Sequence, residues 1–156
     1  MPRFRRHGLA IGCLSAVTAA LSASPAEAQI ANCYAQIKSP SPGGGVPLTG
    51  VVEGYSDAKG NVAVWVLTHR KGMSDWWPQG GGPVSGVGNW SAQVTYGTEK
   101  EAGQPFEIAV VPVDVRTNEG LAGWMARASS YNEYPGIPLP TPAKGCRTQI
   151  VAVQRN

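Results

Sequence analysis

Few residues of this chain could act as a general acid, a general base or a nucleophile in a catalytic spacing. After position 28, His69 is the one histidine, and it precedes two basic residues at the end of an expected strand. A Ser-His-Asp site would need Asp57, Asp75 or Asp114 beside it, and the G-x-S-x-G motif that presents a nucleophilic serine does not occur. We therefore expect His69 to be an exposed loop histidine, and we expect no catalytic residue.

Two further patterns could suggest an active site, and neither has the required form. Glu99 and Glu101 alternate with Lys100 in a polar stretch, which is typical of a solvated turn rather than of a glycosidase carboxylate pair. The glycine-rich stretch 80–86 lacks the Lys-Ser/Thr ending of a phosphate-binding loop. One histidine is too few for the usual zinc ligand sets, so we expect no metal and no cofactor. The sequence predicts a protein that is not an enzyme.

Trp76 and Trp77, which precede Pro78 and a run of glycines, are the residues that we single out for ligand binding. Adjacent residues on a strand point to opposite faces, so the two rings cannot enter one core. We expect one ring to pack and the other to stay partly exposed, where a flat aromatic surface suits a sugar ring or a peptide. The alternative is that the second ring only covers the sandwich or the segment 79–84. The sequence does not decide which ring is exposed.

The elements that would position these residues are strands. Short runs of β-branched and aromatic residues alternate with Gly, Pro, Asn and Asp turns between Gln29 and Asn156, and we find no helix pattern there. Residues 61–69 are apolar on both faces and predict a strand that is covered on both sides, and residues 123–129 are a further candidate strand. Seven or eight short strands favour an all-β, two-sheet sandwich over a barrel.

Two other tryptophans lie inside clean strand patterns, and we expect them in the hydrophobic core. They are Trp65 in the apolar run 61–69 and Trp90 in the alternating run 89–96. We expect both rings to pack in one group with the following aliphatic and aromatic residues: Val64, Val94, Phe106 and Ile108.

The first residues have the features of a secretory signal peptide. Three arginines precede an apolar run at 9–21, and Ala26 and Ala28 supply the small residues of a cleavage site. We expect residues 1–28 to be removed, so that a mature chain starting at Gln29 is secreted or periplasmic and has no membrane span. Without the leader, ten Lys/Arg face nine Asp/Glu, and no basic cluster supports nucleic-acid binding.

Cys33 and Cys146 remain after the leader is removed, and two cysteines in an exported domain most simply form one disulfide. Both begin similar segments, CYAQI and CRTQI, near the two ends of the mature chain. If these segments are parallel strands in register, the cysteines become neighbours and the first and last strands pair. The alternatives are two free thiols or a metal site with other ligands.

Several segments resemble bacterial immunoglobulin-like domains of exported proteins. They are PSPGGGVPLTGVVEGY with Val52-Glu53-Gly54, VWVLTHRKGMSDWWPQ, GNW and FEIAVVPVD, and they cover residues 30–115. The resemblance implies an immunoglobulin-like β-sandwich at 29–156 and an accessory, binding or adhesive module. No cysteine pair flanks Trp65, which differs from antibody-type domains. We expect a non-enzymatic module with a binding or structural role and a glycan or another cell-surface protein as its partner. The alternative is a carbohydrate- or cell-wall-binding module that uses an exposed tryptophan.

Overall fold

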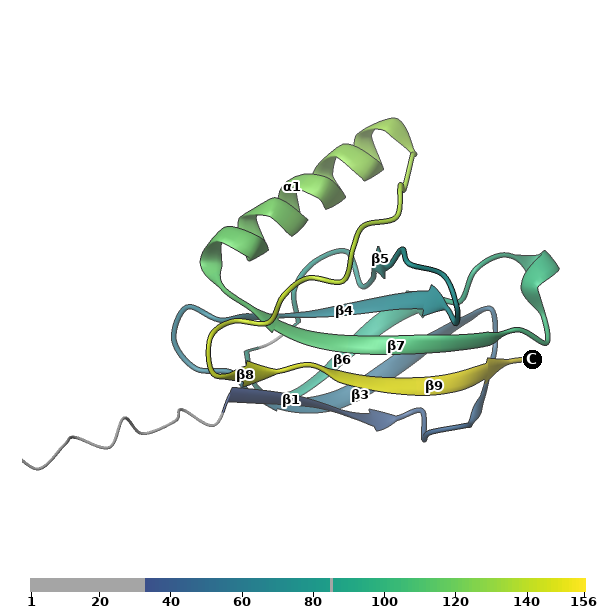
Figure 1. The fold of residues 1–156 in the computed structure, drawn as a ribbon, viewed down its shortest axis with the longest axis horizontal. Coiled ribbons are helices and arrows are strands. Elements are labelled where there is room, and N and C mark those ends of the chain that lie inside the picture. The colour runs from purple at the N-terminus through teal and green to yellow at the C-terminus, as the bar shows by residue number, and fades with distance from the viewer. Residues whose placement is uncertain (1–32, 85) are drawn as a thin grey trace, which may run out of the picture.

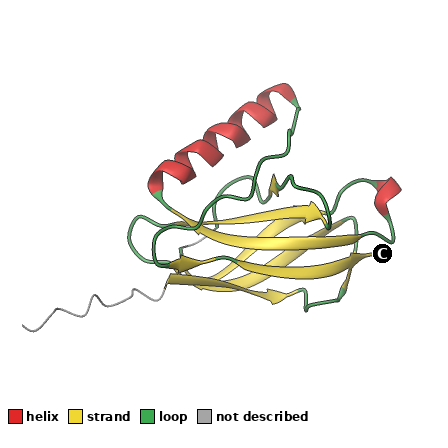
Figure 2. Ribbon diagram, in the orientation of Figure 1, coloured by secondary structure: helices red, strands yellow, loops and turns green. Residues whose placement is uncertain are grey.

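The structure is a computed structural model, and it describes residues 33–84 and 86–156. The described residues form two β-sheets that pack face to face, and one helix lies over the outer face of the second sheet (Figures 1 and 2). The two-sheet sandwich that the sequence predicts is therefore present. The predicted signal peptide and the predicted start at Gln29 lie outside the described residues.

The first sheet has the strand order β6-β3-β1-β8. Its strands are β6 (Val87–Thr95), β3 (Thr49–Asp57), β1 (Cys33–Ser39) and the short β8 (Cys146–Arg147). β3 pairs antiparallel with β6 and with β1, whereas β1 and β8 run parallel. β1, the first described strand, therefore pairs with β8, which comes from the final part of the chain.

The second sheet has the order β2-β9-β7-β4-β5. Its strands are β2 (Gly45–Val46), β9 (Gln149–Arg155), β7 (Pro105–Val113), β4 (Ala63–Arg70) and β5 (Trp77–Pro78). β2 pairs parallel with β9, and the remaining pairs are antiparallel. β4 is buried on both faces, which confirms the prediction from its doubly apolar run.

The main core lies between the two sheets. Trp90 packs there with Val64, Val94, Phe106 and Ile108, as the strand alternation predicts. Gly54 of β3 faces Trp90 of β6 in register. A Cβ at Gly54 would overlap the Trp90 ring, so the strand needs glycine at this position.

The disulfide between Cys33 and Cys146 is formed, and it confirms the predicted pairing. The two cysteines face each other in the parallel β1–β8 register, with a Cα–Cα distance of 4.5 Å. The bond spans a sequence separation of 113 residues, so it ties the first described strand to the final part of the fold.

The prediction that the mature chain contains no helix is wrong. Helix α1 (Val115–Tyr131) includes residues 123–129, which were predicted to form a strand. Asp114 caps its first turn by accepting a hydrogen bond from the Thr117 N–H at 2.8 Å. Asn132 ends the helix in the left-handed conformation, with a φ of 52°. Among the described residues, no helix is long and apolar enough to cross a membrane.

Trp65 is fully buried, but it does not pack with Val64 and Trp90 as we predicted. Neighbouring residues of a strand point to opposite faces, so Trp65 lies on the helix side of β4 and Val64 on the core side. The Trp65 indole N–H donates a hydrogen bond to Asn118 Oδ1 of α1 at 2.8 Å. A second apolar cluster surrounds this ring and consists of Leu67, Trp76, Ala109, Val111, Val113 and Leu121.

Candidate functional site

The two adjacent tryptophans point to opposite faces of the second sheet. Trp77 faces Thr68 in the β4–β5 register, so its side chain lies on the same face as that of Thr68. Trp76 lies on the helix side, where it is 6% exposed and belongs to the cluster around Trp65. Trp77 is half-buried. Trp76 is therefore the packed ring and Trp77 the accessible one.

His69 is buried rather than exposed in a loop, which corrects our expectation. β4 continues to Arg70, so His69 is a strand residue that faces the helix side, and its exposed fraction is 6%. The Trp76 ring stacks on the imidazole, with 3.8 Å between the centroids. The imidazole Nε2 is 2.8 Å from Glu107 Oε2 on the neighbouring strand. Within the described part of the chain, the buried Nδ1 has no hydrogen-bond partner.

A cavity of about 870 Å³ surrounds the end of β4 and the short strand β5. Its lining comes from both sheets, from α1 and from the segment that follows the helix. In Figure 1 that segment and β5 lie between the carboxyl end of α1 and β4. The apolar side chains of the lining are Met73, Trp77, Pro78, Phe106, Trp124, Met125 and Tyr134.

Hydrogen bonds to the backbone hold two of the aromatic walls in place. The Trp77 indole N–H donates to the Tyr134 carbonyl at 2.8 Å, and the Trp124 indole N–H donates to the Pro135 carbonyl at 3.2 Å. The rings of Trp124 and Tyr134 meet edge to face at 6.1 Å. Because both indole N–H groups are used inside the protein, these rings offer apolar surface to a ligand.

Polar side chains join the two sheets along one side of the cavity. The Gln79 side-chain carbonyl accepts the Thr95 N–H at 2.9 Å, and its amide group donates to the Trp77 carbonyl at 3.1 Å. The Thr68 hydroxyl donates to the Thr95 carbonyl at 3.2 Å. Gln93 also lines this side. The lining of the cavity thus combines amide and hydroxyl groups with the half-buried Trp77 ring.

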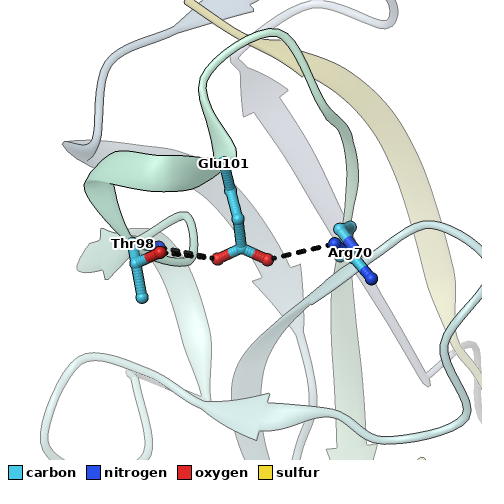
Figure 3. Close-up of polar contacts among 3 residues, drawn as sticks. All are labelled: Arg70, Thr98 and Glu101. Atoms are coloured by element: carbon cyan, nitrogen blue, oxygen red, sulfur yellow. Dashed lines mark hydrogen bonds and ion pairs between the residues drawn. The ribbon is translucent and has the colours of Figure 1, made fainter.

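The charged end of the cavity consists of Arg70 and Glu101 (Figure 3). Glu101 closes the 3-10 helix η1 (Glu99–Glu101), and its Oε2 accepts hydrogen bonds from the Thr98 N–H at 2.8 Å and the Thr98 hydroxyl at 3.2 Å. Its Oε1 lies 3.6 Å from Arg70 Nη1. Glu101 is therefore the structural residue of a turn, as its polar context predicts.

Four residues of the cavity lining were not predicted as site residues from the sequence: Arg70, Trp124, Met125 and Tyr134. Trp124 and Met125 were assigned to a strand, although their spacing from Leu121 and Ala128 fits one face of a helix. Arg70 had no distinguishing sequence signal. Among the residues that the structure describes, no cluster of three or more His, Cys, Asp or Glu side chains could hold a metal ion.

Comparisons with known proteins give the chain no family. No protein-family model matches it, and no curated protein matches it. The solved structures include an engineered protein with a TM-score of 0.43 and 12% sequence identity. The match covers 81% of this chain and 21% of the engineered protein, so this chain spans about a fifth of that protein's length.

Proposed function

We propose that this chain is an exported, non-enzymatic, immunoglobulin-like binding module that holds its ligand against Trp77. The two-sheet sandwich supports the fold part of this proposal, together with the Val52-x-Gly54 strand on which Trp90 packs. The Cys33–Cys146 disulfide supports export, because such bonds persist in oxidising compartments. The intact mass of exported material tests the export step, since loss of residues 1–28 is expected and retention of them would contradict it.

The observation that carries the binding role is the cavity of about 870 Å³ with pre-positioned aromatic walls. Small-molecule sites are typically concave, mostly apolar and about 300–1,000 Å³ in volume, with a few polar groups that orient the ligand. The cavity matches this description. Trp77 is the accessible ring of the adjacent pair, so we expect a ligand in the cavity to contact this ring.

A carbohydrate- or cell-wall-binding module is the second candidate, and one observation favours it. Gln79, Gln93 and Thr95 line the same cavity as Trp77 and bring amide and hydroxyl groups to its lining. Sugar rings stack on flat aromatic surface while their hydroxyls exchange hydrogen bonds with such groups. A glycan would then occupy the same cavity as any other ligand of this module.

A two-part screen tests the proposal. The mature protein is applied to a glycan array, and a fragment collection is screened by NMR while the indole N–H signals of the protein are followed. The proposal predicts hits that shift the Trp77 indole signal and that disappear in Trp77→Ala. The control is Tyr34→Ala, which removes a 36% exposed ring from the outer face of the other sheet. Hits that leave Trp77 unperturbed and survive Trp77→Ala would refute the assignment of the site.

A further inference from the structure

We infer that the ligand of this cavity is an amphipathic carboxylate, with a flat apolar body against Trp77 and its anionic group on the Arg70 guanidinium. This inference rests on the proposed function and specifies the chemistry of its ligand. Three observations at the end of β4 support it. Arg70 lies beside Trp77, the described residues leave some Arg70 N–H donors unused, and Glu101 is held in place by its own turn.

Arg70 and Trp77 are neighbours on one face of the sheet. Trp77 pairs with Thr68, and Arg70 follows two positions later on β4, so both side chains project to the same side as Thr68. Diagonal neighbours of this kind on adjacent strands lie roughly 7–8 Å apart. One small molecule can therefore touch the indole ring and the guanidinium together.

Arg70 has hydrogen-bonding capacity that residues 33–84 and 86–156 do not use. A guanidinium has five N–H donors in a planar fork that matches a carboxylate. Its ion pair within the described residues is with Glu101 at 3.6 Å, which is longer than a hydrogen bond. The indole N–H groups of Trp77 and Trp124 already bind backbone carbonyls. Arg70 is therefore the charged donor that the cavity presents to an acceptor on the ligand.

Glu101 does not block an anion, because its carboxylate is held at its own turn. Both Thr98 donors bind its Oε2, and its Oε1 faces one edge of the guanidinium (Figure 3). This contact draws Arg70 toward one side of the cavity and leaves other N–H groups of the fork for a ligand. The negative charge of Glu101 still weakens anion binding, and removal of that charge should strengthen it.

The apolar part of the ligand follows from the rest of the lining. Trp77, Trp124, Met73 and Met125 supply flat or adaptable apolar surface. Apart from His69, whose Nε2 contacts Glu107, the charged side chains among the described lining residues are Arg70 and Glu101, so the charge of a ligand is sensed at this end. The positive charge of Arg70 would repel a cationic amphiphile bound on the aromatic surface, so such a ligand is disfavoured.

The test uses two probes with the same body, 2-naphthylacetate and the neutral 2-naphthylacetamide, titrated into the mature protein while the Trp77 indole signal is followed by NMR. The inference predicts that the carboxylate binds about tenfold more tightly than the amide, as a charge-assisted hydrogen bond allows. Arg70→Gln should remove this preference. Lys71→Gln should keep it, because this control removes the same charge from an exposed neighbour that does not line the cavity.

Glu101→Gln gives an independent check. Glutamine can replace glutamate in a capping box, so the turn should persist while the charge is lost. The carboxylate probe should then bind roughly two- to fivefold more tightly, the effect of a partly exposed charge. Equal affinity of the two probes at Trp77, or a preference that survives Arg70→Gln, would overturn this inference and leave the proposed function intact. Binding of neither probe at Trp77 would contradict both the inference and the proposed site.

Discussion

The Trp76 ring lies flat on the His69 imidazole, with centroids 3.8 Å apart and an interplanar angle of 12°. The next residue, Trp77, begins the short strand β5, points to the opposite face of the sheet and is half-buried. Adjacent residues of one type therefore have different roles. Trp76 closes the apolar layer under α1, and Trp77 forms a wall of the cavity.

This difference predicts unequal effects of two alanine substitutions on stability. Trp76→Ala removes a buried ring and should lower the free energy of unfolding by about 3–5 kcal/mol. Trp77→Ala should change it by about 1 kcal/mol or less, as changes of accessible residues do. Urea unfolding followed by circular dichroism measures both values. Equal, severe destabilisation by the two substitutions would place Trp77 in the core and end its assignment to a ligand.

Gly54 gives a second prediction, with a control on the same strand. A methyl group at Gly54 would overlap the Trp90 ring and the Gln36 carbonyl, so Gly54→Ala should lower stability by about 3 kcal/mol or more. At Gly50 of β3 the nearest heavy atom to an added Cβ is 3.6 Å away, an ordinary contact. Gly50→Ala should therefore stay within about 1 kcal/mol of the parent. Thermal unfolding of the two variants tests this, and similar midpoints would contradict the packing of Trp90 on Gly54.

The disulfide supplies a third prediction. It closes a loop with a sequence separation of 113 residues, and the chain-entropy model assigns such a loop a stabilisation of about 4–5 kcal/mol. Reduction of the protein should lower its unfolding midpoint in urea accordingly. A Cys33→Ser, Cys146→Ser double variant should show the low midpoint with or without reductant. Recovery of two alkylatable thiols from native protein would instead show that the bond does not form.

The cap of α1 predicts a dependence of stability on pH. The hydrogen bond from the Thr117 N–H lowers the pKa of Asp114 below its ordinary value of 3.8. The ionised cap therefore stabilises the fold above that value, and its contribution is lost as the pH falls through the lower folded-state pKa. The melting temperature of the parent should drop further between about pH 5 and pH 2 than that of Asp114→Asn, a neutral cap. Parallel curves for the two proteins would show that the Asp114 charge makes no contribution.

The sandwich, the disulfide and the buried faces of β4 could be predicted because each rests on a strong local signal. Alternating apolar residues mark strands, and a pair of cysteines in an exported domain marks a disulfide. Trp65 lies opposite Val64 in the strand alternation, and the doubly apolar run predicts that both faces of this strand are covered, but the element that covers the Trp65 face was not identified. The element that covers this face is helix α1, which was not predicted.

The helix was missed although its signals were present. Asp114 is a suitable N-cap, and Leu121, Trp124, Met125 and Ala128 recur at helical spacing. Gly120 and Gly123 lower the helix propensity of the same stretch and hide the pattern. The cavity could not be predicted without α1, since part of its wall is on this helix. The burial of His69 could not be predicted for the same reason, because His69 lies on the helix side of β4.

The most direct test of the central claim is the affinity of Trp77→Ala for a ligand that binds the parent protein. Isothermal titration is performed with the parent, with Trp77→Ala and with the control Tyr34→Ala, after circular dichroism has shown that all three are folded. The account predicts that Trp77→Ala weakens binding by about tenfold or more, as loss of an anchoring tryptophan does, while Tyr34→Ala binds like the parent. Unchanged affinity of folded Trp77→Ala would contradict the claim that this ring and its cavity form the binding site.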